Sequence, residues 1–154
     1  MAISENNALS AQDIADYFLS NIDEESGDNV SNLKLQKLLY YAQGFHLALF
    51  GKPLFEEAIL AWQHGPVVPE IYHRFKHYAA NALPPPEKFD RSKYAPAISE
   101  LLDEILSVYG QYSALKLRSM THEEPPWSQT AINHRIPDHA MRDFFKTLVV
   151  DGTA

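Results

Sequence analysis

A carboxylate and two imidazoles have the spacing of a metal site in this 154-residue sequence. Glu70, His73 and His77 fall at i, i+3 and i+7, so a helix would place all three on one face. This set suggests a metal-dependent hydrolase, although zinc hydrolases also need a complete ligand set and a base held in fixed geometry. The alternative is a solvated polar face opposite Tyr72 and Phe75, and we expect no bound metal.

A second cluster, His122-Glu123-Glu124, has the residue types for acid–base catalysis. No nucleophile or oxyanion-binding group accompanies it, and the sequence has neither a Gly-rich phosphate loop nor a nucleophile elbow. His46 falls near the apolar stripe of a helix, where a hydrogen-bonded core histidine is expected rather than a ligand. These residues predict a protein that is not an enzyme and uses no cofactor.

Tryptophan, glycine and proline residues form a candidate site of another kind. Trp62 and Trp127 either fill the core or border a groove for another protein, because tryptophan is a strong anchor at interfaces. Gly65-Pro66 predicts a turn that sets the direction of the following helix. We expect the partner-binding surface to be bordered by Trp62, His64, Tyr72 and Arg74.

Hydrophobic periodicity predicts the elements that position these residues: a single, compact, mainly α domain of about six helices. The strongest pattern predicts a helix over 31–50, ended by Gly51 and long enough to cross most of the protein. Residues 54–63 are ambiguous and include a candidate small two-stranded β element. The other helices are expected over 10–22, 69–80, 96–109, 113–120 and 138–148, with an acidic loop over 23–29.

The connection between the third and fourth helices contains Pro84-Pro85-Pro86 and little periodicity. Long connections of this kind are often functional. We expect the third helix, this connection and the last helix to form one face of the binding surface.

Two lysines and a glycine stand out within the helix over 31–50. Lys34 and Lys37 lie near its start, where the helix dipole disfavours cations. They either extend into solvent, or one of them binds a carboxylate or carbonyl elsewhere. Gly44 costs about 1 kcal/mol relative to alanine inside a helix, so we expect another backbone to approach closely there.

Length and composition define the class of protein. With 45% hydrophobic and 21% charged residues, the chain should form one domain over 1–154 with its core over about 11–148. The absence of cysteine excludes disulfides and thiolate metal sites. Neither a secretion signal nor a membrane-spanning apolar run is visible, so we expect a cytoplasmic protein without membrane contact. The net charge of −7 disfavours direct nucleic-acid binding, which needs clustered Lys and Arg, and fits a basic protein partner better.

Three blocks rich in glycine, proline and aromatic residues extend over more than half of the chain. The first comprises Leu35, Lys37, Leu38, Leu39, Tyr40 and Tyr41, followed by Gly51-Lys52-Pro53-Leu54-Phe55. The second comprises Ala61-Trp62, Gly65-Pro66-Val67-Val68-Pro69 and Tyr72, and the third Ser113, Leu117, Thr121, His122, Pro126 and Trp127. In this order the blocks resemble the Panacea domain family, the phage- and toxin–antitoxin-associated group that includes SocA-like and GepA-like proteins.

The resemblance implies an antitoxin of a prophage-associated toxin–antitoxin pair, which binds its cognate toxin directly and neutralises it. Some relatives are thought to deliver the toxin to a cellular protease, so a protease adaptor is the alternative function. Many members carry an added DNA-binding segment, and almost nothing here lies outside the domain, which argues against autoregulation through DNA contact. Within the blocks, structural roles are expected for Lys37, Tyr41, Gly65, Pro66 and Trp127.

Overall fold

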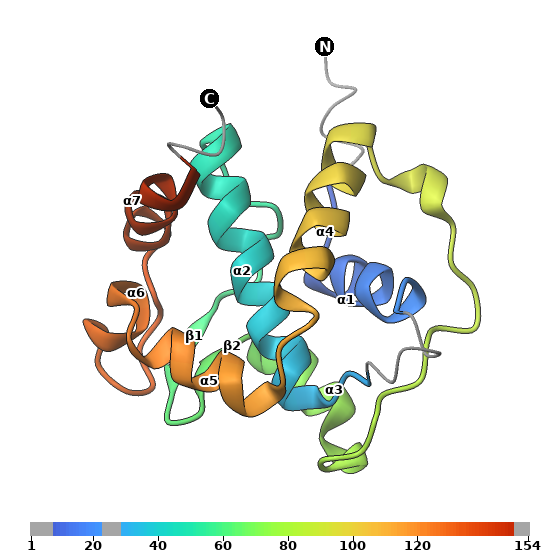
Figure 1. The fold of residues 1–154 in the computed structure, drawn as a ribbon, viewed down its shortest axis with the longest axis horizontal. Coiled ribbons are helices and arrows are strands. Elements are labelled where there is room, and N and C mark those ends of the chain that lie inside the picture. The colour runs from blue at the N-terminus through green and yellow to red at the C-terminus, as the bar shows by residue number, and fades with distance from the viewer. Residues whose placement is uncertain (1–7, 23–28, 150–154) are drawn as a thin grey trace.

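The computed structural model describes residues 8–22 and 29–149, and within them seven α-helices and a two-stranded sheet form the fold (Figure 1). The helices are α1 (Ala11–Ser20), α2 (Asn32–Phe50), α3 (Pro69–Phe75), α4 (Pro96–Tyr109), α5 (Ala114–His122), α6 (Pro125–Ser128) and α7 (Asp138–Val149). The strands are β1 (Leu60–Trp62) and β2 (Gly65–Val67), and two 3-10 helices are η3 (Lys76–Tyr78) and η4 (Arg91–Lys93). The mainly α fold is confirmed, while most of the expected acidic loop over 23–29 lies outside the described residues.

The central helix α2 is covered on several sides by other elements (Figure 1). Ser31 caps its start by accepting a hydrogen bond from the Lys34 backbone N–H, and Gly51 ends it in the left-handed conformation with a φ of 77°. Fourteen of its 19 residues are buried, so polar side chains of the helix must find partners inside the protein.

Two buried glutamines of α2 hold the segment that follows this helix. Gln43 donates to the Phe55 carbonyl at 2.8 Å and accepts from the Leu54 N–H at 2.7 Å. Gln36 accepts from the Val68 N–H at 2.8 Å, directly before α3 begins. These bonds fix the hairpin and the start of α3 against α2, because a buried backbone group left without a partner would cost about 1–3 kcal/mol.

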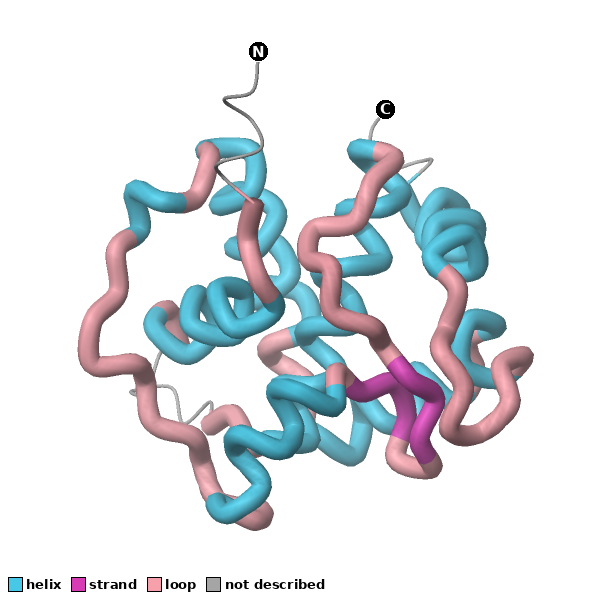
Figure 2. The backbone as a smooth tube through the Cα atoms, turned by 180° about the vertical axis from the view of Figure 1, so that it is seen from behind, coloured by secondary structure: helices cyan, strands magenta, loops and turns pink. Residues whose placement is uncertain are grey.

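The β-hairpin lies where the sequence was ambiguous, but its second strand extends beyond residues 54–63. Its antiparallel register pairs Leu60 with Val67 and Trp62 with Gly65 (Figure 2). The segment before α7 continues the pairing, since the Ala61 N–H donates to the His134 carbonyl at 3.0 Å. The Gly65-Pro66 turn predicted from the sequence is therefore part of a strand.

Helix α3 is shorter than the predicted helix over 69–80. It ends at Phe75, and Ala79 after η3 has a φ of 53°, which cannot continue an α-helix. The chain turns back toward the core, where the Leu83 N–H donates to the Val30 carbonyl at 2.8 Å. This tertiary contact ends a helix whose local pattern favours a longer one.

Gly44 permits a close contact between α2 and α7. A Cβ at this position would lie 2.1 Å from Cε2 of Phe145, so any side chain would displace that ring. The neighbour is thus an aromatic side chain and not the backbone expected from the sequence. The Phe145 ring also makes edge contacts with Tyr40 and Tyr41, at centroid distances of 5.3 and 5.8 Å.

Lys34 and His46 are both buried on α2. Lys34 donates to the Gly110 carbonyl at 2.6 Å. His46 Nδ1 lies 2.7 Å from the Lys52 carbonyl, which confirms a hydrogen-bonded core histidine. No helix in the described part of the chain is long and apolar enough to cross a membrane.

Candidate functional site

A buried lysine lies beneath the hairpin. The Lys37 side chain is fully buried, and its Nζ donates to the Pro66 carbonyl at 3.3 Å. Gly65 leaves room for it, because a Cβ there would lie 2.8 Å from Lys37 Cε and 2.9 Å from Thr121 Oγ1. Lys34 and Lys37 therefore both bind backbone carbonyls, and the expectation that they extend into solvent is wrong.

Three further basic side chains lie close enough to Lys37 to act on one another. Burial, with a smaller contribution from the Arg118 guanidinium, lowers the pKa of Lys37 to about 7. Burial also lowers the pKa of His64 and His122, and Lys37 and Arg118 act on both in the same direction. We call Lys37, His64, Arg118 and His122 the basic cluster.

An open groove of about 580 Å³ adjoins the basic cluster, between the start of α2, η3 and the start of α5. His64, Lys76 and Arg118 supply its basic groups, and Leu115 on its wall is 70% exposed. The remaining wall residues are Ser31, Asn32, Leu33, Tyr72, Ala79, Ala80 and Ala114. None of the lining residues is an aspartate or glutamate, although the protein as a whole carries a net charge of −7.

The structure brings together three of the four residues expected to border a partner surface. His64 and Tyr72 line the groove, and the half-buried Trp62 ring packs edge-on against Tyr72 at a centroid distance of 5.2 Å. Arg74 points elsewhere, because its Nη1 donates to Gln12 Oε1 on α1 at 2.7 Å. The expected face of third helix, proline-containing connection and last helix is not formed, since α7 lies on the opposite side of the molecule from that connection (Figure 1).

Trp127 has a structural position. Its Nε1 donates to the Trp62 carbonyl at 2.7 Å, which ties α6 to the end of β1. Its ring stacks on His122 at 4.0 Å with an interplanar angle of 12°. The half-buried Trp127 therefore packs within the fold and supports the hairpin from the side away from α3.

The His122-Glu123-Glu124 sequence is not assembled as an acid–base site. Glu124 accepts hydrogen bonds from the hydroxyl groups of Tyr40 and Tyr41, each at 2.9 Å. Burial raises the pKa of Glu124 to about 7, although the two hydroxyl donors act against this shift. Glu123 is exposed, and the His122 ring faces Trp127 instead of either carboxylate. Both Glu124 oxygens are occupied, so this carboxylate joins α2 to the end of α5.

The metal-site hypothesis finds no support in the geometry. Glu70 and His73 are on α3, whereas His77 lies in η3, so the three residues do not share one continuous α-helical face. Across the described residues, no group of three or more His, Cys, Asp or Glu side chains is arranged to hold a metal ion. Glu70 instead lies 3.9 Å from Arg74, one turn away.

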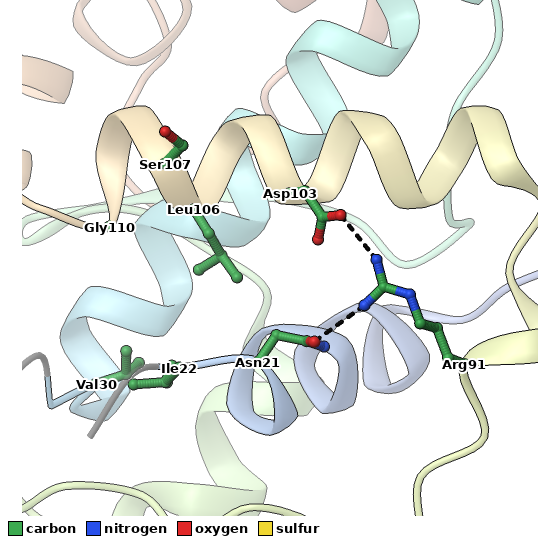
Figure 3. A pocket seen from close by; sticks show the side chains of 8 residues that line it. All are labelled: Asn21, Ile22, Val30, Arg91, Asp103, Leu106, Ser107 and Gly110. Atoms are coloured by element: carbon green, nitrogen blue, oxygen red, sulfur yellow. Dashed lines mark hydrogen bonds and ion pairs between the residues drawn. The ribbon is translucent and has the colours of Figure 1, made fainter. Parts of the chain in front are cut away.

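A second cavity, of about 300 Å³, lies between the end of α1 and α4 (Figure 3). Arg91 reaches across it and donates to Asn21 Oδ1 at 3.0 Å and to Asp103 Oδ2 at 2.7 Å (Figure 3). Asp103 also accepts from the Tyr17 hydroxyl. Arg91, Asn21 and Asp103 are thus bound to one another, and these bonds join α1 and α4.

Comparison with known proteins identifies the family. The family model described as "Antitoxin SocA-like, Panacea domain" matches residues 35–128. The chain is 31% identical over 143 residues to Antitoxin SocA of Caulobacter vibrioides, and the alignment covers 76% of this chain and 72% of that protein. This chain belongs to the SocA-like Panacea family. No solved structure matches it.

The matched Panacea region extends from α2 to α6, whereas α1 and α7 lie outside it. It contains Lys37, Gly65 and Trp127, and also Lys76 and Arg118 of the groove. Membership in this Panacea family supports an antitoxin role, a toxin as the general class of partner and a role other than catalysis.

Sequence reasoning missed Lys76, Leu115 and Arg118 of the groove and the hydrogen bonds from Tyr40 and Tyr41 to Glu124. Lys76 lies in the short basic stretch His73-Arg74-Phe75-Lys76-His77, and Arg118 is 42 positions away (118 − 76), so no local motif joins the two. Leu115 alone carried a signal, because it lies off the buried stripe of a short helix whose inward residues are Leu117 and Thr121.

Proposed function

We propose that this protein is an antitoxin that neutralises its cognate toxin by direct and stoichiometric protein–protein binding in the cytoplasm. The observation that carries the proposal is the SocA-like Panacea match, which includes the hairpin and all groove residues except Ser31, Asn32 and Leu33. Trp62, His64 and Tyr72 are the proposed border of the toxin-binding surface, whereas Arg74, which is held by Gln12, is left out of it.

The internal chemistry supports binding over turnover. Glu124 is occupied by two tyrosine hydroxyls, and Lys37 is buried beneath the hairpin. Neither group is available to a substrate in this arrangement. The half-buried Trp62 and Tyr72 and the exposed Leu115 instead have the composition of an interface, where a few anchors supply most of the binding energy.

The test is to express the neighbouring open reading frame from an inducible promoter, with and without this chain. We expect growth arrest by the neighbour alone, relief by co-expression, and co-purification of the two chains at a 1:1 or other fixed ratio. A harmless neighbour, or relief without any complex, would contradict the proposal.

The same strains separate occlusion from delivery to a protease. Toxin held in an inactive complex keeps its steady-state level on an immunoblot, whereas toxin delivered for degradation disappears and reappears in a protease-deficient host. We expect the first result, since stoichiometric capture requires only a complementary surface.

A further inference from the structure

The groove is a local reversal of the charge of the whole protein. The chain has a net charge of −7, yet the groove presents Lys76 and Arg118 with His64 and contains no acidic lining residue. Burial lowers the pKa of His64, and the buried Lys37 and the exposed Arg118 both lower it further, so positive charge from these groups extends to the groove. A surface of this kind attracts negatively charged groups.

Arg118 differs from every other arginine of the chain. The other four each pair with a carboxylate: Arg74 with Glu70 at 3.9 Å, Arg91 with Asp103 at 2.7 Å, Arg135 with Asp138 at 3.7 Å and Arg142 with Asp143 at 3.2 Å. Within the described residues, neither Arg118 nor Lys76 forms an ion pair. Both are exposed, so their donors are available to another molecule.

The groove also has an apolar side. Leu115 is 70% exposed, more than any other large hydrophobic residue of the described chain, and Leu33, Ala80 and Ala114 continue its surface. A single exposed leucine requires no explanation. One that lines the same groove as two cations without ion pairs in the described chain matches the anatomy of an interface, in which apolar and polar groups lie side by side.

We infer that this groove docks an acidic segment of a partner protein, with an apolar side chain of that segment against Leu115 and its carboxylates on Arg118 and Lys76. The inference rests on the proposed function only in taking that partner to be the toxin. Arginine suits this task because its planar guanidinium binds a carboxylate through two parallel hydrogen bonds.

A protein segment fits the groove better than a nucleic acid. Nucleic-acid binding needs a series of Lys and Arg to follow the phosphates, whereas the groove offers two permanent cations within a mostly apolar wall. A segment with one apolar anchor and flanking carboxylates would satisfy both the apolar and the basic parts.

The first experiment uses the purified full-length chain and a short synthetic peptide with a central phenylalanine flanked on both sides by glutamates. A control peptide has lysine in place of each glutamate. We expect the acidic peptide alone to change the amide chemical shifts of Leu115, Arg118 and Ala80, and added salt to weaken its binding. Binding of both peptides alike would overturn the inference.

Charge reversal supplies the matched variants. Lys76→Glu with Arg118→Glu should weaken peptide binding at least about tenfold, because two attractive pairs become repulsive. Lys52→Glu with Lys146→Glu changes the net charge by the same amount on exposed residues away from the groove and should leave binding unchanged. All four positions are exposed, so both variants should keep the wild-type melting temperature. Equal loss in the two variants would show a general charge effect and overturn the inference.

Other occupants give different results, and each would overturn the inference. Inorganic phosphate that causes the same shifts at equal ionic strength would indicate a site for small anions. Competition by duplex DNA at physiological salt would indicate a nucleic-acid surface. A concentration-dependent dimer that Lys76→Glu with Arg118→Glu dissociates would indicate a second copy of this chain.

The growth assay distinguishes this inference from the proposed function. If the wild type and the groove variant neutralise the toxin equally, the antitoxin function stands and the groove is not the docking site. If the peptide results are as expected while the wild type neutralises no neighbouring toxin, the groove stands and the antitoxin proposal fails.

Discussion

Two ionisable side chains, the half-buried Glu124 and the fully buried Lys37, contact or belong to α2, and the protein holds them in different ways. Glu124 reaches α2 from the end of α5 and accepts one hydroxyl hydrogen bond on each oxygen, both of 2.9 Å. Lys37 is part of α2 itself and donates to one carbonyl at 3.3 Å. The carboxylate is thus well satisfied, whereas the ammonium has one long hydrogen bond for three donors.

The surroundings of the two groups also differ. Glu124 lies among packed side chains of the fold, whereas Lys37 lies next to a surface groove. Around Glu124, Tyr41 stacks on Tyr109 at 4.0 Å and Phe145 packs against both bonded tyrosines, so aromatic rings hold the two hydroxyl donors of this carboxylate in place. Around Lys37, the neighbours are basic groups that continue into the open groove. A buried polar group stabilises a fold only when its partners are complete. The Lys37 region should therefore tolerate chemical change at the charge itself but not loss of the space it occupies.

The largest loss of stability is expected when a side chain at Gly65 fills the space that Lys37 occupies. Gly65→Val should lower the free energy of unfolding by about 1–3 kcal/mol from backbone strain at a φ of 111°, and by about a further 1–3 kcal/mol from overpacking against Lys37 and Thr121. Urea denaturation measures the loss. Gly51→Val is the matched control, because its φ is 77° but nothing lies within 4 Å of the added Cβ. Equal losses in the two variants would refute the tight contact with Lys37.

The next largest loss of stability is expected when the Glu124 carboxylate is removed. Glu124→Ala removes the acceptor of two tyrosine hydroxyls, and each hydroxyl left unsatisfied should cost about 1–3 kcal/mol. Glu123→Ala, a change at the exposed neighbour, should alter stability by no more than about 0.5 kcal/mol. Thermal unfolding measures the stability of both variants. Equal losses in Glu124→Ala and Glu123→Ala would contradict the stabilising role of the Glu124 hydrogen bonds.

A smaller effect on stability is expected when the charge of Lys37 is removed. Lys37→Met keeps most of the side-chain volume, and loss of the desolvation cost should offset loss of the bond to Pro66. Stability at pH 7 should stay within about 1.5 kcal/mol of the wild type. Denaturation of this variant beside Glu124→Ala tests the contrast directly, since a comparable loss would mean that the ammonium contributes as much as the carboxylate.

The smallest effect is the change in stability per pH unit, and its sign differs between Glu124 and Lys37. The folded state raises the pKa of Glu124 from 4.5 to about 7, so its stabilising contribution is complete below pH 4.5 and is lost as the pH rises toward 7. The folded state lowers the pKa of Lys37 from 10.5 to about 7, so its contribution is complete above pH 10.5 and is lost as the pH falls toward 7. Each effect is at most about 1.4 kcal/mol per pH unit.

Difference profiles isolate these contributions from other titrating groups. The stability of the wild type minus that of Glu124→Gln should fall between pH 4.5 and 7. The stability of the wild type minus that of Lys37→Met should rise between pH 7 and 10.5. Two flat difference curves would show that the folded state shifts the pKa of neither Glu124 nor Lys37.

Several parts of the fold could be predicted because their causes are local. Ser10 and Asp13 form a capping box at the start of α1, and Ser113 caps α5 by accepting from the Lys116 N–H. The predicted end of α3 was wrong. The chain after this helix turns toward the core, where Leu83 bonds to Val30, and no local pattern indicates this contact. Trp62, His64 and Tyr72 were expected together and lie together, whereas Arg74 is held by Gln12 on another helix.

The sequence by itself determined the class of fold, the main helix boundaries and the family, since caps, periodicity and ordered motifs all lie within short stretches of chain. Tertiary structure alone decided that Lys37 meets Pro66, that Tyr40 meets Glu124, and that Arg118 remains without a carboxylate. The first two contacts join residues 29 and 84 positions apart. The charge state and availability of a side chain depend on the burial and partners found at such distances, and these exist only once the helices have packed.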